Sequence, residues 1–288
     1  MSIRPPSKTA FAAAGHRAAH QVVEQGRVFS DPFAVRILGV SPDIIRTETE
    51  ANPGRAAMRF FLASRSRIAE DAIAESVATR GLSQLVVLGA GLDTFAYRNP
   101  FAGKLRVFEV DHAGTQTWKR QRLAETGIDI PADISYVPVD FERDRLMDQL
   151  YAAGLDPKKR TFFMWLGVVP YLTRAAIAAT LKAAASVPGG AEIAFDYGNP
   201  HDSLPPEIRA SAQERAERVA ALGEPFLSFF EDAEMHALLK EAGFTKIDDL
   251  NPAEIAERIL PPEVIAAAQA AGRRRPTAGG HIVVAMTS

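Results

Sequence analysis

Short runs of apolar residues, separated by helix-like segments, constrain the fold of this chain more than any other feature of its sequence. An uninterrupted apolar run bounded by turn residues is typical of a strand buried on both faces, and parallel strands need helical crossovers between them. The alternation therefore predicts an α/β fold in which helices cover both faces of a mostly parallel sheet. The runs that we interpret as strands span residues 85–88, 105–110, 134–139, 161–166, 191–197, 244–250 and 281–286.

Helical patterns lie between these runs and also before the first of them. The first 80 residues contain no strand signal, and Asp31-Pro32 is expected to start a short helix there, because proline favours the first turn of a helix. The longer segments that we interpret as helices are residues 8–25, 55–79, 114–126, 174–186 and 231–242.

Nothing in this pattern marks a second hydrophobic core, and a chain of 288 residues is compatible with one large domain. We therefore expect a single domain over residues 1–288. Within it, the sequence predicts a helical cap at 1–80, a Rossmann-like core at 81–288 and a lid at 197–230.

Composition and charge exclude several classes of function. A net charge of −2 offers no basic surface for wrapping nucleic acid, and the one dense basic run, residues 273–275, is expected to be a solvated loop. The absence of cysteine excludes disulfides, thiolate metal sites and cysteine nucleophiles. The longest apolar stretch, residues 162–172, is too short to span a bilayer. Since the first residues also lack a signal-peptide pattern, we expect a cytoplasmic protein that acts without a membrane.

The strongest local signal is a glycine turn after the first strand, in the sequence LVVLGAGLDT. Gly89 and Gly91 place backbone without side chains at the carboxyl end of the sheet, where a nucleotide-like ligand can lie against the chain. A nicotinamide fingerprint would need a small residue where this chain has Thr94. The acidic Asp93 suits a ligand with a cationic amino-acid part better than a pyrophosphate. We expect Gly89, Gly91 and Asp93 to contact the ligand.

Carboxylates follow the next two strands. Glu109 and Asp111 end the second strand about twenty residues after the glycine turn, a spacing at which a carboxylate accepts hydrogen bonds from a ribose diol. Both side chains share one face of the strand, so either can serve. After the third strand, Asp140 can accept from an adenine amine and Phe141 offers apolar surface to the ring. Three signals on three successive strand ends predict a nucleoside pocket.

The amino-acid sequences of several motifs, and their order along the chain, are similar to those of one enzyme family. The chain resembles the leucine carboxyl methyltransferase-like family, in particular its bacterial branch of S-adenosylmethionine-dependent O-methyltransferases. The resemblance implies a class I methyltransferase fold with seven strands, the last antiparallel, S-adenosyl-L-methionine as cofactor and a small-molecule methyl acceptor. The matching stretches cover most of the chain and are Arg65-Ser66-Arg67 and residues 86–98, 108–112, 137–141, 170–173 and 223–230.

The resemblance also implies roles for individual residues, carried over by motif. Arg65 would hold the methionine carboxylate and Gly89 would line the cofactor. Asp111 would hold the ribose, and Asp140 and Phe141 would surround the adenine.

One position departs from the family pattern. Relatives usually carry a glutamate after the fourth strand, where this chain has Leu166. No carboxylate is available at that position to hold the amine of the cofactor. Asp93 or a backbone carbonyl is expected to substitute for it.

Methyl transfer from a sulfonium is an in-line displacement, which positioning and water exclusion accelerate. A carboxylate acceptor is already ionised at neutral pH, whereas a hydroxyl acceptor has more need of a general base. We expect O-methylation of a small molecule at one of these two groups. The candidates for acting on the acceptor are Tyr171, Tyr197 and His201, with Asp196 and Arg17 as further partners.

Other functions stay open at this stage. His16 and His20 have metal-ligand spacing on a helix, but no third ligand is evident, so we expect no metal. A nicotinamide-dependent oxidoreductase is one alternative, against which Asp93 argues. A catalytically silent module that binds the cofactor or a related nucleoside is another, which Leu166 favours.

Overall fold

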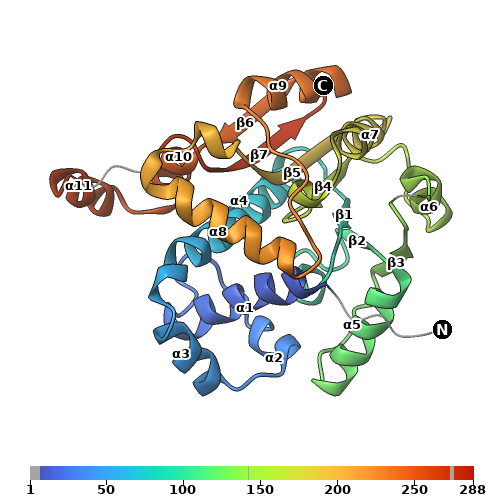
Figure 1. The fold of residues 1–288 in the computed structure, drawn as a ribbon. Coiled ribbons are helices and arrows are strands. Elements are labelled where there is room, and N and C mark those ends of the chain that lie inside the picture. The colour runs from blue at the N-terminus through green and yellow to red at the C-terminus, as the bar shows by residue number, and fades with distance from the viewer. Residues whose placement is uncertain (1–6, 142, 273–275) are drawn as a thin grey trace.

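Seven strands form one sheet in the computed structural model, which describes residues 7–141, 143–272 and 276–288 (Figure 1). The strand order is β3-β2-β1-β4-β5-β7-β6. Strand β7 runs antiparallel to β5 and β6, and the other neighbours are parallel. The basic run at 273–275 lies outside the described residues. The strands are β1 (Gln84–Leu88), β2 (Arg106–Asp111), β3 (Ile134–Pro138), β4 (Thr161–Trp165), β5 (Ala191–Gly198), β6 (Lys246–Leu250) and β7 (Gly280–Met286).

The expected strands and long helices are confirmed, with ends that differ from the expected ones by at most two residues. The short helix expected at Asp31-Pro32 begins later, at Ala34, because the Asp31 carboxylate accepts the backbone N–H of Phe33 (3.2 Å) in a turn that precedes it. The confirmed helices are α1 (Lys8–Val23), α4 (Ala56–Thr79), α5 (Ala113–Glu125), α7 (Arg174–Ala185) and α9 (Asp232–Ala242), and the short one is α2 (Ala34–Leu38).

Further helices were not expected from the apolar pattern. Several of them have proline in the first turn, which was an available signal for their starts. They are α3 (Pro42–Glu50), α6 (Leu146–Ala152), α8 (Pro206–Ala221), α10 (Pro252–Ile259) and α11 (Pro262–Ala270), with short 3-10 turns η1 (Pro53–Arg55), η2 (Phe95–Tyr97), η3 (Val169–Tyr171) and η4 (His201–Ser203).

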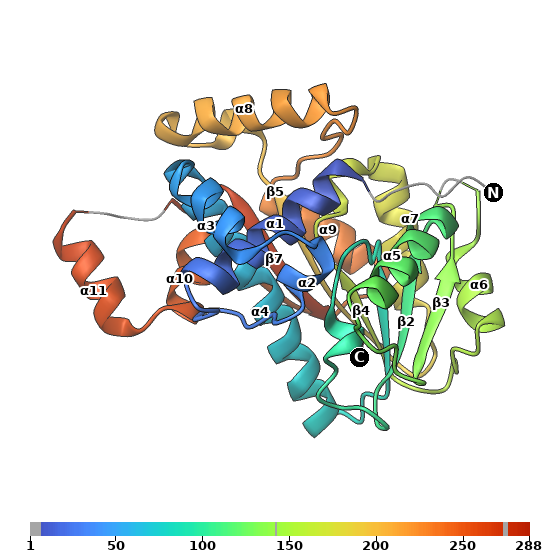
Figure 2. The same cartoon turned by 90° about the horizontal axis from the view of Figure 1, so that it is seen from below.

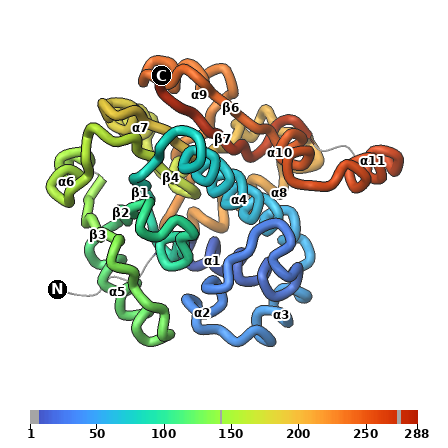
Figure 3. Tube along the Cα trace, turned by 180° about the vertical axis from the view of Figure 1, so that it is seen from behind, coloured from blue at the N-terminus to red at the C-terminus, as the bar shows by residue number. Residues whose placement is uncertain are grey.

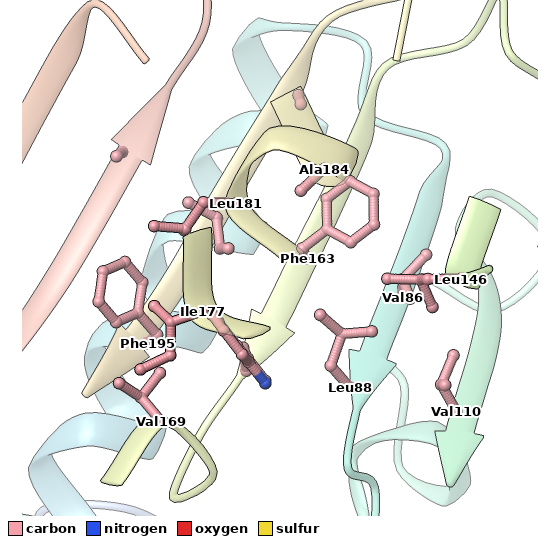
Figure 4. Close-up of a cluster of buried hydrophobic side chains, with 14 of the residues drawn as sticks. Val86, Leu88, Val110, Leu146, Phe163, Val169, Ile177, Leu181, Ala184 and Phe195 are labelled. Carbon is pink, nitrogen blue, oxygen red and sulfur yellow. The ribbon is translucent and has the colours of Figure 1, made fainter. Parts of the chain in front are cut away.

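The sheet has a hydrophobic core on each face, because alternate residues of each strand point to opposite sides. Val86 and Leu88 of β1 join one cluster, shown in Figure 4, to which helices α6, α7 and α9 contribute side chains. Leu85 and Val87 join the opposite cluster, to which α1, α2, α4 and α5 contribute. Both faces of the sheet are therefore covered, as the continuous apolar strands predicted. None of the helices in the described part of the chain combines the length and apolar character needed to cross a bilayer.

Helices α1, α2 and α3 gather at one end of the molecule, and α4 runs from them along the sheet (Figures 2 and 3). Ala18 and Ala19 of α1 pack against Ala34 of α2 and Ile45 of α3 in a small core of their own. The cap thus formed meets the carboxyl end of the strands, since Arg17 of α1 donates to the carbonyl of Leu92, just after β1 (2.6 Å).

A buried ion pair joins β2 to α5. The Lys119 ammonium lies 2.9 Å from both carboxylate oxygens of Glu109, and the Tyr97 hydroxyl donates to the same carboxylate at 3.0 Å. Glu109 is 0% exposed and Lys119 is 1% exposed. Of the two acids at the end of β2, Glu109 therefore supports the fold, and Asp111 remains at the edge.

Replacing Glu109 by alanine is expected to destabilise the protein by about 3–5 kcal/mol, because it leaves the Lys119 ammonium buried without its carboxylate partner. Urea denaturation measures the loss. The matched control is Glu125→Ala, which removes an exposed carboxylate from α5, the helix that carries Lys119. This change should affect the unfolding free energy little. A loss for Glu109→Ala no greater than that of the control would contradict this account.

Candidate functional site

The glycine turn after β1 forms the base of the candidate site. Gly89 has φ = 63° and Gly91 has φ = 43°, backbone angles that L side chains rarely adopt. A Cβ atom on Gly89 would lie 2.6 Å from a methyl of Val168, in the loop after β4. The turn therefore needs glycine both for its conformation and for the close approach of the neighbouring loop.

Asp111 connects this turn to the end of β2. One of its carboxylate oxygens accepts the backbone N–H of Gly91 and the other accepts that of His112, both at 2.7 Å. The side chain is half-buried. Since each carboxylate oxygen can accept more than one hydrogen bond, Asp111 keeps acceptor capacity for a ligand beside the turn.

The segment after β3 continues the same edge of the sheet. The N–H of Val139 donates to the carbonyl of Asp111 (3.0 Å), which places Asp140 next to the end of β2. Asp140 is paired with Arg143, at 3.8 Å between Nε and the carboxylate. Phe141 is partly buried against the core cluster of Figure 4. Residues from the ends of β1, β2 and β3 thus lie along one edge, in the order that the sequence predicted.

Arg65 reaches this edge from α4 and forms a buried ion pair with Asp196 of β5. Its Nη1 donates to Asp196 at 2.8 Å, and the two side chains are 9% and 7% exposed. The second oxygen of Asp196 accepts the N–H of Gly167 at 2.6 Å. The Nε of Arg65 is buried and has no hydrogen-bond partner in the described part of the chain. The guanidinium therefore retains donor capacity that the protein does not use.

Asp196 also lies beside Leu166, the position at which the sequence departs from the family pattern. Strands β4 and β5 pair with Trp165 opposite Phe195, so the following residues, Leu166 and Asp196, are neighbours across the sheet. Leu166 is partly buried against the core, and Asp196 supplies a carboxylate beside it. The acid missing from the end of β4 is thus available from the next strand.

Asp93 and Arg17 are engaged within the turn. One carboxylate oxygen of Asp93 accepts the N–H of Phe95 (2.8 Å) at the start of η2. Arg17 donates to Asp31 at 3.1 Å in addition to the Leu92 carbonyl. Arg17 therefore ties the cap to the glycine turn, a role that the sequence did not indicate.

Tyr171 lies among charged groups from several elements. Burial raises the pKa of its hydroxyl, while a hydrogen bond with Thr9 and the nearby Arg65 act in the opposite direction. The negative charges of Glu224 and Asp196 add to the rise. Tyr171 therefore lies near the Arg65–Asp196 pair.

Tyr197 and His201 are placed differently from Tyr171. The Tyr197 hydroxyl donates to Asp249 (2.7 Å), the ring stacks on His281 with centroids 4.7 Å apart, and the residue is 2% exposed. Burial and the nearby Asp249 raise its pKa. His201 packs against Phe229, with ring centroids 4.9 Å apart. Phe229 in turn packs on Phe226, which packs on Tyr171, so a chain of aromatic rings links His201 to Tyr171.

A strap, residues 222–230, follows α8 and closes over η3. Its Leu227 donates to the Pro170 carbonyl at 2.7 Å, and Phe226 packs on Tyr171 with centroids 5.2 Å apart. Glu224 accepts the backbone N–H groups of Lys8 (2.9 Å) and Thr9 (3.1 Å), at the N-terminus of α1 where the helix dipole favours an anion. The strap and the cap are therefore joined through one carboxylate, which the sequence motif alone did not reveal.

Two cavities lie away from this edge. One of about 350 Å³ is bounded by Arg27, Phe29 and Glu70, and one of about 280 Å³ by Ile68, Lys246 and Arg258. At the candidate site, helix α1, the loop after β4 and the strap cover the ends of the strands instead.

His16 faces arginines of α4 from α1. Burial, together with the positive charges of Arg55, Arg59 and Arg65, lowers its pKa to about 4. His20 is engaged separately, with Glu24 2.9 Å from its Nδ1. In the described part of the chain, no three His, Asp or Glu side chains are grouped so that they could hold a metal ion. His16 instead indicates a positive electrostatic potential between α1 and α4.

Comparison with known proteins gave one family and several relatives. The family described as "Leucine carboxyl methyltransferase" matches residues 10–185. "Putative S-adenosyl-L-methionine-dependent methyltransferase YktD" of Bacillus subtilis (strain 168) is 37% identical over 177 residues, which are 61% of this chain and 58% of that protein. A Mycobacterium avium (strain 104) protein named "Putative S-adenosyl-L-methionine-dependent methyltransferase" is 30% identical over 278 residues, which are 89% of this chain and 88% of that protein.

Solved structures show the same fold. The structure of a "putative methyltransferase" from Thermobifida fusca YX superposes with a TM-score of 0.58 at 14% identity. The match covers 99% of this chain and 96% of that one. A DUF574 family protein of Streptomyces avermitilis gives a TM-score of 0.56 at 17% identity, covering 98% of each chain. At these identities the likeness concerns the fold alone, and it agrees with the seven-stranded sheet described above.

The lowered pKa of His16 predicts a specific pH dependence of stability. A histidine whose folded pKa is depressed stabilises the native state above its unfolded pKa of about 6.5, and this contribution is lost as the pH falls toward 4. Between pH 7 and pH 5, the unfolding free energy of His16→Gln should therefore fall by about 2 kcal/mol less than that of the wild type. Urea denaturation at each pH measures the difference. Equal pH dependence in the two proteins would show that His16 is not held neutral by its surroundings.

Proposed function

Since the chain belongs to the leucine carboxyl methyltransferase family, we propose that it is an S-adenosylmethionine-dependent methyltransferase that methylates an oxygen atom of a small organic acid. The observation that carries the proposal is the set of donors and acceptors at the carboxyl ends of β1, β2, β4 and β5. This proposal takes residues 1–288 as one methyltransferase domain, with 1–80 as its cap and 197–230 as its lid.

The residues at this edge fit the adenosine part of the cofactor. Gly89 and Gly91 leave the turn free of side chains, and Asp111 beside them keeps acceptor capacity for the ribose hydroxyls. Asp140 and Phe141 follow in the position for the adenine. These assignments rest on the order of the residues along the edge and on the hydrogen bonds that join them.

The methionine part of the cofactor carries an ammonium and a carboxylate on the same carbon atom. Asp196 and Arg65 are complementary to these two groups. The buried Nε of Arg65 without a partner fits the carboxylate, and Asp196 at 2.8 Å from the same guanidinium fits the ammonium. Asp196 then serves in place of the family's acid at Leu166. We assign the ammonium to Asp196 before Asp93, because Asp196 lies beside Leu166 and next to the guanidinium that would hold the carboxylate.

When bound, S-adenosylmethionine supplies an electrophilic methyl group on a sulfonium, with a neutral thioether as leaving group. The protein then needs to orient the acceptor in line and to exclude water. The strap over η3, joined to α1 through Glu224, is placed for exclusion of water. Tyr171 lies beneath it, next to Arg65, where a hydroxyl can donate to the acceptor or orient it.

The choice of a carboxylate over a hydroxyl acceptor rests on charge. Of the three arginines that lower the pKa of His16, Arg59 and Arg65 are paired with carboxylates. The third, Arg55, is exposed and can attract an anionic acceptor. A pKa of about 4 makes His16 a weak base for deprotonating a hydroxyl. Tyr197 is buried against Asp249, so it is not placed for that task. A carboxylate acceptor needs no general base. Its binding site needs only cationic groups to hold it and side chains that orient it toward the methyl group.

Asp111→Ala is expected to weaken S-adenosylhomocysteine binding by roughly 1.5–3 kcal/mol, the range for hydrogen bonds to a charged group, without unfolding the protein. Isothermal titration measures the affinity and circular dichroism the fold. The matched control is Asp129→Ala, an exposed aspartate in the loop after α5, which should leave binding unchanged. Absence of binding by the wild type, together with clear binding of NAD, would contradict the methyltransferase proposal.

The acceptor group is tested by the stability of the product to base. Cofactor labelled in its methyl group is offered with a panel of organic acids, phenols and amines, and the labelled product is treated with mild base. We expect release of the label as methanol, because a methyl ester hydrolyses whereas an ether or N-methyl group does not. Base-stable label would exclude the carboxylate and direct attention to a hydroxyl acceptor.

A further inference from the structure

The outlying helix α8 carries an arginine toward the candidate site. Figures 1 and 2 show α8 outside the cap, between β5 and the strap that ends over η3. Arg215 is on this helix, and the titratable groups whose charges shift its pKa are Tyr171 and Arg218. Tyr171 is also acted on by Arg65. Tyr171 therefore lies near an arginine of the lid and near an arginine of the cofactor edge.

Arg215 has no protein partner in the described part of the chain. Its Nε is buried without a hydrogen bond, and its guanidinium forms no ion pair there. Burial lowers its pKa, and Arg218 lowers it further, against the opposite effect of Tyr171. Arg209, on the same helix, also has a buried Nε without a hydrogen bond, but its Nη2 donates to the carbonyls of Asp202 and Leu204, both at 3.0 Å. A partly buried cation without a partner costs stability, so its retention points to a ligand.

The other arginines near the site are already occupied. Arg65 is paired with Asp196, Arg59 donates to Glu24 through two nitrogens, and Arg17 is held by Asp31. Arg55 is exposed at the start of α4. Arg65 keeps one unused donor beside its carboxylate partner, whereas Arg215 has neither a hydrogen bond nor an ion pair within the described residues.

We propose that Arg215 and Tyr171 form the binding site for the carboxylate of the methyl acceptor, and that Arg215 selects anionic acids over neutral compounds. The inference rests on the proposed function, because it assumes a methyl donor held by Arg65 and Asp196. A guanidinium fork matches the two oxygens of a carboxylate, and Tyr171 adds a hydroxyl donor.

The site also distinguishes substrate from product by charge. In the transfer, one carboxylate oxygen forms a bond to the methyl carbon while the carbon–sulfur bond breaks and its electron pair stays on sulfur. The sulfonium becomes a neutral thioether, the carboxylate becomes a neutral ester, and no proton is transferred. Arg215 therefore attracts the acid and has no charge to attract in the ester, which favours release of the product.

The test compares Arg215→Gln with Arg218→Gln, since Arg218 is an exposed arginine on the same helix. Each protein is saturated with S-adenosylhomocysteine and titrated with benzoate, 4-hydroxybenzoate and octanoate, and with their primary amides and methyl esters. In the wild type and in Arg218→Gln, we expect at least one acid to bind roughly tenfold to a hundredfold more tightly than its amide and its ester. In Arg215→Gln this preference should disappear.

Two further measurements separate this inference from the proposed function. Affinity for S-adenosylhomocysteine should be the same in all three proteins, and its absence in the wild type would reject the proposed function itself. The melting temperature of Arg215→Gln should equal or exceed that of the wild type, because the guanidinium has no hydrogen bond or ion pair within the described residues to lose. A clear fall would show a structural role and overturn the inference. If cofactor binding is intact but no acid is preferred, or the preference survives in Arg215→Gln, the assignment of Arg215 is wrong.

Discussion

A single buried carboxylate holds together the parts of this molecule that meet at the ends of the strands. Asp196 of β5 accepts from Arg65 of α4 and from the backbone of Gly167 after β4, so it connects the cap to two neighbouring strands. An ion pair this deeply buried needs its partners closely positioned, because each charge has lost its hydration. The positions of α4 and of the loop before η3 therefore depend on each other. A residue at the centre of the proposed site is also an anchor of the fold.

The fold could be predicted from the sequence further than the site could. Continuous apolar runs such as 85–88 indicated the strands because a sheet covered on both faces requires apolar side chains on both. The period of two placed Glu109 and Asp111 on one face but contains no information on depth, and only the structure separates the buried Lys119 partner from the acid at the edge. Helix α8 was not expected, because few of its residues are buried and the apolar pattern is weak.

Contacts between distant residues account for the rest of what sequence reasoning missed. Asp196 was a candidate to act on the acceptor, but its pairing with Arg65 spans 131 positions and leaves no local pattern. The same is true of Glu224, whose partners at Lys8 and Thr9 are more than 200 positions away. Tyr197 was expected near the acceptor because it lies at the carboxyl end of the fifth strand, whereas its side chain points into a cluster with Asp249 and His281. Strand position predicts the edge of the sheet that a residue approaches and not what its side chain meets there.

The place of β7 has a consequence for how the protein is made. This strand, residues 280–286, lies between β5 and β6, both of which leave the ribosome before it. Until β7 arrives, the nascent sheet ends at β5 with an open edge, and β6 has no neighbour to pair with. Open edges of this kind are templates for pairing with other chains. The growing polypeptide thus passes through a stage that is prone to aggregation, and the pairing of β7 with β5 and β6 ends it.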